Sequence, residues 1–355
     1  MDPIKVLKRA WEITWRYRAL WIFGIILALT TGGGGFGGGG GGGGDGIQYN
    51  FKGEDFPDFQ WGQISPPEVV STLIAIGVGL ACVIVILIIA ATIARYVAET
   101  ALIRMVDETE ETGQKHSVRQ GFRLGWSRTA WRLFLIKLLV SLPVAVAFIL
   151  LFALALAPLL VWTTESTPAR VMGTVTTIGL FFLALFLAIV VGAVLSLLIK
   201  FFWRACTLEE LGVIESIRQG FSIVRRHLKD VGIMWLIMVG VGIGWVIAMI
   251  AIAIVLLPAI ILLIVVGGVL GGLPALLVGG LASLFFEGAV PWILAAVIGL
   301  PIFILVVVAP WLFLGGLMEV FKSSVWTLTY REVRALESVE PEPDQLPEPD
   351  MPDLE

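Results

Sequence analysis

The stretch SVRQGFRL at residues 117–124 recurs as SIRQGFSI at residues 216–223 and, more distantly, as VLKRAWEI at residues 6–13. When Lys8, Arg119 and Arg218 are aligned, a small, an aromatic and an aliphatic residue follow at matching positions in all three copies. Each copy stands just before a long apolar run. The pattern predicts three repeats of one unit, an interfacial amphipathic helix followed by a transmembrane hairpin.

The composition predicts an all-α integral membrane protein. Of the 355 residues, 58% are hydrophobic and 15% are charged, whereas a soluble domain has about a quarter charged residues. Residues 143–163 and 171–199 contain no ionisable side chain, and each run exceeds the roughly 20 apolar residues that cross a bilayer as a helix.

We predict about six transmembrane helices, at residues 19–31, 71–94, 133–161, 171–202, 231–265 and 290–318. The first is short, and we expect it to continue the basic segment before it, because residues 4–23 contain no Gly or Pro. A signal peptide is the competing interpretation, although no Ala-x-Ala-like cleavage site follows. Residues 266–289 fit an interfacial segment, a re-entrant segment or two further short spans.

The distribution of Lys and Arg predicts the orientation. These residues gather before residue 19, at residues 95–132 and 204–229, and after residue 321, while the alternate connections carry almost none. The positive-inside rule then places both termini in the cytoplasm of a multi-pass protein of the cell (plasma) membrane.

Two low-complexity segments interrupt or follow the expected membrane domain of residues 1–336. Its repeats cover about residues 4–107, 116–210 and 215–334. Residues 32–65 form a Gly-rich and then acidic, aromatic stretch that predicts a flexible external loop, and residues 337–355 are acidic and Pro-rich, which predicts a disordered cytoplasmic tail.

Basic residues within the repeated pattern are candidates for contact with anionic lipid headgroups, because Lys and Arg beside a membrane span attract such lipids. The candidates are Lys8, Arg9, Arg119, Arg123, Arg218 and Arg225.

A second similarity follows the even-numbered spans, in LIRMVDE, FWRACTLEE and TYREVRALE. Each contains one arginine, Arg104, Arg204 or Arg331, with acidic residues within the next turn or two. One interpretation is helix ends at the interface with Arg and Glu paired along the surface. The other is a cytoplasmic ring of charge, and spacing alone does not separate the two.

No catalytic, cofactor-binding or metal-binding pattern is present, so we expect no enzymatic activity and no cofactor. His116 and His227 lack metal-ligand spacing, and Cys82 and Cys206 lie far apart in the sequence. With a net charge of −4 and its basic residues set beside spans, the chain is not expected to bind nucleic acid. A protein partner or a homo-oligomer remains open.

The stretches ALIRMVDETEETGQKHSVRQGFRLGWSRTAWRLFLIKLL (residues 101–139) and SSVWTLTYREV (residues 323–333) resemble uncharacterised bacterial polytopic membrane proteins. These are related to the membrane domain of some glycerophosphoryl diester phosphodiesterases. The resemblance covers most of the chain and implies a six-span, repeat-built membrane domain in a bacterial inner membrane. It does not imply phosphodiesterase activity, which belongs to a separate soluble domain.

The sequence therefore favours a non-enzymatic scaffold, assembly or lipid-interacting membrane domain. The alternative is a permease or channel-like transporter of a small or lipidic solute, because the chain combines repeats, span prolines and a glycine-rich stretch. The sequence specifies neither a substrate nor an oligomeric state, nor a role for the polyglycine stretch.

Overall fold

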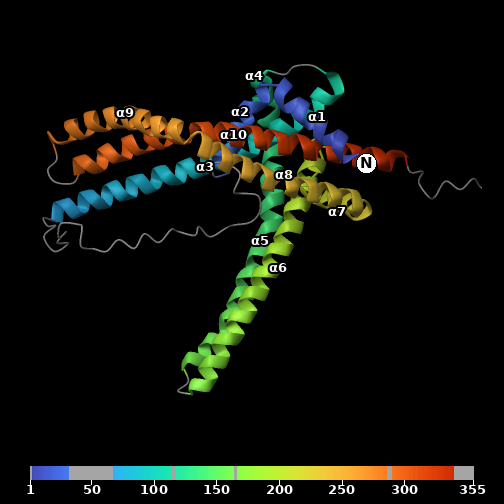
Figure 1. Cartoon of the computed structure of the whole chain (residues 1–355), viewed down its shortest axis with the longest axis horizontal. Coiled ribbons are helices and arrows are strands. Elements are labelled where there is room, and N and C mark those ends of the chain that lie inside the picture. The colour runs from blue at the N-terminus through green and yellow to red at the C-terminus, as the bar shows by residue number, and fades with distance from the viewer. Residues whose placement is uncertain (1, 32–66, 114–116, 164–165, 286–289, 340–355) are drawn as a thin grey trace, which may run out of the picture. The chain divides into compact units, whose positions relative to one another are not determined.

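The computed structural model describes residues 2–31, 67–113, 117–163, 166–285 and 290–339, and every regular element in these ranges is a helix (Figure 1). The elements in chain order are α1 (Pro3–Arg16), α2 (Ala19–Thr30), α3 (Pro67–Thr112), α4 (Val118–Gly125), α5 (Arg128–Leu156), the 3₁₀ helix η2 (Ala157–Thr163), α6 (Thr167–Leu208), α7 (Val213–Arg226), α8 (Leu228–Val255), α9 (Leu257–Ala282) and α10 (Val290–Val339). The predicted external loop at residues 32–65 and nearly all of the predicted tail lie outside the described residues.

The expectation of an all-α protein with membrane-spanning helices is confirmed. The described residues contain six helices that are long and apolar enough to cross a membrane, namely α3, α5 with η2, α6, α8, α9 and α10. Helices α3, α6 and α10 have 46, 42 and 50 residues. At about 1.5 Å per residue each is at least twice as long as the roughly 30 Å hydrocarbon core is thick, so their polar C-terminal ends have length to extend beyond it.

The expectation that the first span continues the basic segment before it is wrong. Helix α1 ends at Arg16, α2 begins at Ala19, and the two are bent by 100°. The backbone N–H of Tyr17 still donates to the carbonyl of Ile13, but Tyr17 has left helical geometry, with φ −112° and ψ 81°. The change of direction coincides with a change of side-chain pattern, because α1 is amphipathic and α2 is almost entirely apolar.

The predicted span at residues 231–265 is also wrong, because the helix breaks at Leu256. Pro258 lies in the first turn of α9, where its missing N–H is tolerated, whereas a continuous helix would bring its ring against the carbonyl of residue 254. Helix α9 then covers most of the segment that sequence left open. In contrast, Pro143, Pro301 and Pro310 lie inside helices.

The chain divides into two compact units, with the boundaries inside α2, α3, α8 and α10. The first contains residues 1–20, 99–240 and 320–355, and the second contains residues 21–98 and 241–319. The first unit draws on all three predicted repeats, so the units do not follow the repeat boundaries.

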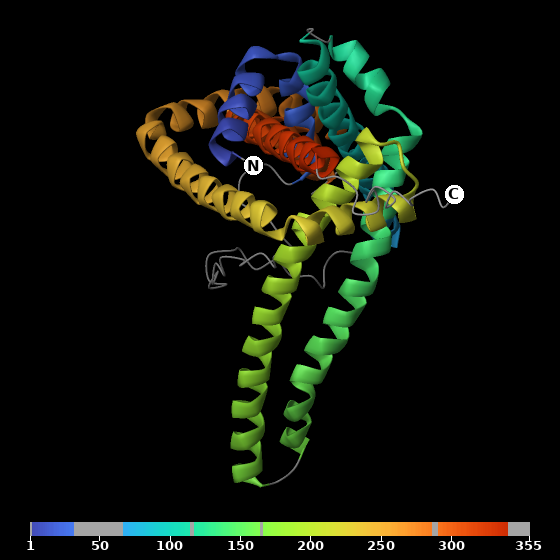
Figure 2. The ribbon, with the colours of Figure 1, turned by 90° about the vertical axis from the view of Figure 1, so that its right-hand side faces the viewer.

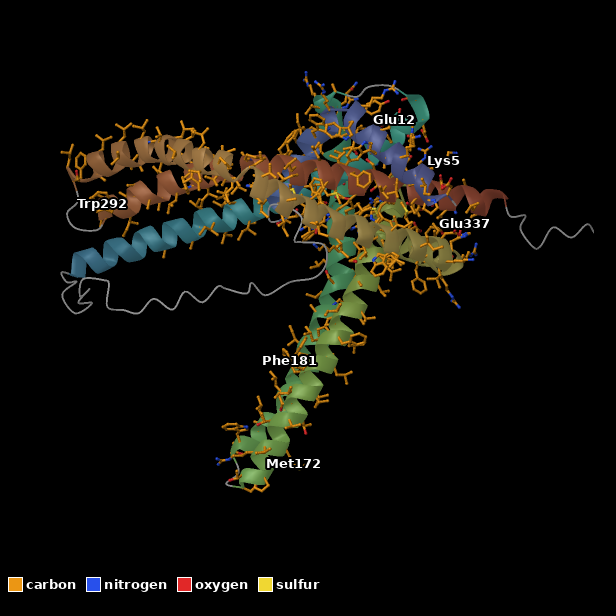
Figure 3. All side chains as sticks on the ribbon, viewed as in Figure 1. Lys5, Glu12, Met172, Phe181, Trp292 and Glu337 are labelled. Carbon is orange, nitrogen blue, oxygen red and sulfur yellow. The ribbon has the colours of Figure 1, made fainter. Side chains whose placement is uncertain are left out.

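The first unit has a buried core and an extended hairpin. Side chains from α1, α3, α6 and α10 fill the core, among them Ile13, Leu102, Phe201 and Trp326, each at most 1% exposed. Helices α5 and α6 run side by side as an antiparallel hairpin (Figure 2). Apolar side chains project from this hairpin along its length, for example at Met172 and Phe181 (Figure 3).

In the second unit, one face of α9 packs closely on the first half of α10. A Cβ atom added at Gly271 would lie 2.6 Å from the carbonyl oxygen of Gly299, and one at Gly267 would lie 3.2 Å from the ring of Phe303. Positions Gly268 and Gly272 have nothing within 4 Å. The pair Gly267 and Gly271 therefore forms the small-residue contact surface, and its neighbours do not.

We predict that Gly271→Ala lowers the free energy of unfolding by about 1–3 kcal/mol. The new methyl group would clash with the backbone carbonyl of Gly299, which cannot move away as a flexible side chain could. The adjacent Gly272→Ala is the matched control and is expected to be neutral or stabilising, since alanine favours a helix by roughly 0.5–1 kcal/mol over glycine. Denaturant unfolding in detergent measures both. Equal effects of the two substitutions would contradict the assigned packing face.

Candidate functional site

The three amphipathic helices α1, α4 and α7 place their repeated residues in the same way. The small residues Ala10, Gly121 and Gly220 are buried. The aromatic residue that follows each of them is exposed, by 56% at Trp11, 41% at Phe122 and 50% at Phe221. The repeated pattern thus presents a small inner position against the protein and an aromatic outer position.

At Gly220 the small residue is required by a close helix contact. A Cβ atom there would lie 2.6 Å from the ring of Phe202 and 3.1 Å from the backbone nitrogen of the same residue. Helix α7 therefore lies directly on the end of α6, which holds Phe221 on the opposite, exposed side.

Five of the six predicted lipid contacts are free for a ligand. Their side chains are exposed, and within the described part of the chain none has an ion-pair partner: Lys8, Arg119, Arg123, Arg218 and Arg225. They share their helices with the exposed aromatic residues, which gives each helix a basic and aromatic outer surface.

Arg9, the sixth candidate, is held by the protein itself. Its Nε donates to Glu110 on α3 at 2.6 Å, and one terminal nitrogen donates to Glu12 at 3.0 Å. The hydrogen bond to Glu110 raises the pKa of Arg9 above its ordinary value. This residue fastens α1 to α3 and has little capacity left for a headgroup.

The arginines of the second similarity pair with acidic residues on other helices. Arg331 on α10 binds Asp107 on α3 and lies 3.6 Å from Glu111. Arg104 on α3 binds Glu210, just beyond the end of α6, at 3.0 Å. Both arginines are thus paired with carboxylates, and their bonds join the ends of separate helices.

Residues that the sequence analysis did not select complete this network. The hydroxyl of Tyr330 donates to Glu209 at 2.5 Å, and Arg334 lies 3.4 Å from the same carboxylate. Arg132 on α5 donates to the backbone carbonyls of Glu210 and Leu211. We call the set Arg104, Asp107, Glu209, Glu210, Tyr330, Arg331 and Arg334 the polar network. The only sequence signal for Tyr330 was its place beside the repeated arginine.

Arg204 differs from the other two repeated arginines. It is 1% exposed and forms no ion pair within 4 Å with the described residues. Its terminal nitrogens donate to the carbonyl oxygens of Lys200 and Ser323. Of the three arginines in the predicted ring, two are thus held by inter-helix ion pairs, and the third is a buried guanidinium that joins α6 to the backbone of α10.

Aromatic packing surrounds this contact. Phe201 meets Trp326 and Tyr330 with ring centroids about 6 Å apart, and the ammonium group of Lys200 lies 4.7 Å from the centroid of the Trp326 ring. Buried threonines in the same helices, such as Thr207 and Thr327, bond to carbonyls one turn earlier in their own helix. The buried threonines are thus satisfied within their own helices, whereas the hydroxyls of Ser323 and Ser324 and the indole N–H of Trp326 are buried without a hydrogen-bond partner among the described residues.

Two grooves open on the surface of the first unit. One has a volume of about 520 Å³ and lies at the bend between α1 and α2, against α3. The other, of about 470 Å³, lies between α1 and the ends of α3 and α10, where Lys5, Lys8 and Arg9 face Glu12, Glu110 and Glu332. Figure 3 labels Lys5 and Glu12 on α1, two of the residues that line this second groove.

Metal chemistry finds no support in the described ranges, which contain no group of three or more His, Cys, Asp or Glu side chains able to hold a metal ion. His116 lies outside them. Cys82 is exposed and Cys206 is buried, and both are free thiols.

Comparison with known proteins identifies the family. A sequence profile described as "Family of unknown function (DUF7544)" matches residues 2–330, so the chain belongs to this family. Comparisons with curated proteins and with solved structures found no match. The resemblance to the membrane domain of glycerophosphoryl diester phosphodiesterases stays a prediction.

We predict that Asp107 and Arg331 are energetically coupled. In a double-mutant cycle of Asp107→Asn and Arg331→Gln, the double variant should be more stable than the sum of the single effects implies, by about 0.5–3 kcal/mol, because each single change leaves a partly buried charge unpaired. The control is a second double-mutant cycle of Arg331→Gln with Glu12→Gln, because Glu12 forms no bond with Arg331. A coupling energy of zero for the first pair would contradict the network.

Tyr330→Phe should destabilise the protein by roughly 1–2 kcal/mol, because it removes a hydrogen bond from a largely buried hydroxyl to a carboxylate. Tyr17→Phe is the control, since the hydroxyl of Tyr17 has no partner among the described residues. Thermal unfolding in detergent compares the two, and equal melting temperatures would show that the Glu209 contact contributes nothing.

Proposed function

We propose that the chain is a non-enzymatic, lipid-binding membrane scaffold. Three amphipathic helices rest on anionic headgroups, and the polar network holds the helix ends in register. The observation that carries this proposal is the outer surface of α1, α4 and α7, where unpaired basic side chains stand beside exposed aromatic ones at equivalent positions. Such a surface fits the boundary between headgroups and acyl chains.

The charges on this surface supply the preference for anionic lipid. A basic side chain near such a membrane contributes about 1 kcal/mol of attraction, and the contribution falls off within a Debye length. Because Lys8, Arg119, Arg123, Arg218 and Arg225 have no ion-pair partner among the residues that the structure describes, that attraction does not compete with an ion pair there.

The contacts of the first unit support a six-crossing topology. The ends of α3, α6 and α10 bind one another through the polar network, so they lie on one side of the membrane. Helix α1 lies on that side too, because Arg9 binds Glu110 and Trp11 packs on Phe321. The segment from α2 to α3 must then cross an even number of times, as must α5 with α6.

The same constraint applies to the last three helices. Helix α7 precedes α8, and Arg226 at its end lies 3.9 Å from Glu337 at the end of α10. With α10 crossing once, α8 and α9 together cross an odd number of times and act as one broken span in the crossing count. The chain then crosses the membrane six times. Because Lys and Arg are abundant on the shared side, the positive-inside rule makes that side the cytoplasm of a bacterial plasma membrane. Both termini lie on that side.

A permease is the second candidate. It is favoured by the break at Leu256 inside an apolar segment, since transporter sites are often built from interrupted helices. The threonines Thr207 and Thr327 near Arg204 bond to carbonyls of their own helices and are not available to line a solute path.

Replacing Arg119, Arg123, Arg218 and Arg225 together by Ala should strongly reduce the phosphatidylglycerol retained by the purified protein, at about 1 kcal/mol per residue. Native mass spectrometry counts the bound lipids. The four-fold Lys variant is the control and should retain them, because it keeps the charge. Unchanged lipid retention in the Ala variant would refute the proposal.

The topology predicts that Ser283, beyond α9, lies on the side opposite Thr112, at the end of α3. In a variant without native cysteines, Ser283→Cys should react with a membrane-impermeant maleimide only from outside, and Thr112→Cys only from inside. Labelling of both from the same side would contradict the parity argument.

A further inference from the structure

The bend between α1 and α2 forms a groove whose lining combines cationic, aromatic and apolar side chains. Four consecutive residues at the bend, Trp15, Arg16, Tyr17 and Arg18, line it together with the first two residues of α2, and Met105 and Thr109 of α3 complete it. Its volume is about 520 Å³.

The charge of this lining is of one sign. Arg16 and Arg18 contribute two guanidinium groups, and no carboxylate is among the lining residues. The second groove instead mixes Lys and Arg with three glutamates. Arg16 does approach Glu12 at 3.5 Å, but both side chains are at least half exposed, and such a surface pair contributes little. A phosphate group can therefore displace it.

The chemistry of the lining points to a ligand with a phosphate at one end and an apolar body. Guanidinium groups bind phosphate through paired N–H donors. Trp and Tyr side chains prefer the headgroup level, where one end is apolar and the other is wet. Behind them, Met105 is 2% exposed and Leu20 is 1% exposed, so the inner wall of the groove is apolar.

The position of the groove in the chain fits the same ligand. It lies where the amphipathic α1 gives way to the apolar α2, with a bend of 100°. If α1 rests on the membrane and α2 enters it, the bend lies at the depth of the lipid phosphates. At the second bend, between α4 and α5, Trp126 corresponds to Trp15 and one arginine, Arg128, follows; the paired guanidinium groups belong to the first bend.

We propose that this groove binds the phosphodiester group of one glycerophospholipid, with Arg16 and Arg18 as its ligands. The inference deepens the proposed function and rests on it, since it requires α1 to lie on the membrane. It adds a single saturable site to the diffuse attraction of the outer basic surface.

The test is a titration of the purified full-length protein with dioctanoyl phosphatidylglycerol, followed by native mass spectrometry. The wild-type protein should bind one lipid molecule tightly and further lipid molecules weakly. The double variant Arg16→Ala with Arg18→Ala should raise the dissociation constant of the tight site at least tenfold. Arg128→Ala with Lys229→Ala removes the same charge from exposed positions just after α4 and α7 and should leave the tight site unchanged. Because Arg16 and Arg18 are exposed, the variants are expected to unfold at the wild-type temperature.

Three results would overturn the proposal. The first is a tight site unaffected by the Arg16 and Arg18 substitutions, and the second is equal weakening by the control pair. The third is displacement of the lipid by inorganic phosphate at equal concentration, which would identify a free-anion site. The two proposals can fail separately. If the four-fold Ala variant of Arg119, Arg123, Arg218 and Arg225 loses the weakly bound lipids, but the variant of Arg16 and Arg18 keeps the tightly bound lipid, only the proposed groove site is refuted. The reverse result would refute the surface proposal alone.

Discussion

The polar network between the ends of α3, α6 and α10 is the constraint on which the first unit depends. The ion pairs of Arg104, Arg331 and Arg334 and the hydrogen bond of the Tyr330 hydroxyl join helices that are far apart in the sequence. The buried guanidinium of Arg204 adds a further contact between α6 and α10. Such bonds are individually modest where water reaches them, as at Glu210, which is 75% exposed, and an unpaired partner is more costly where it is partly buried, as at Asp107. The network brings the ends of α3, α6 and α10 together.

The sequence predicted those features that depend on local periodicity. The amphipathic helices follow from the spacing of small, aromatic and basic residues, and their buried and exposed positions agree with that spacing. The helical class and the long apolar spans follow from composition. Pro258 supplied a signal for the break at Leu256, but proline also occurs within α5 and α10, so residue type alone does not separate a break from a tolerated kink.

Pairings between distant residues could not be predicted in this way. Arg331 selects Asp107, which is 224 positions away, and nothing in either local pattern specifies that choice. Arg9 and Lys8 are neighbours with the same chemistry, yet only Arg9 meets a carboxylate. The bend at Tyr17 escaped prediction as well, because residues 4–23 contain no helix breaker and the turn follows from the change of surroundings between α1 and α2.

The residues of the polar network lie far apart in the sequence, so their contacts can form only in a certain order during synthesis. Asp107 is synthesised with α3, and Glu209 follows at the end of α6, long before their partners on α10 leave the ribosome. Arg9 and Glu110, by contrast, are both present once the first hairpin is made. The N-terminal part can therefore close early, while Asp107 and Glu209 lack their partners until the last helix arrives. Only a chain synthesised to residue 334 can complete the network, which makes α10 the closing element of the assembly.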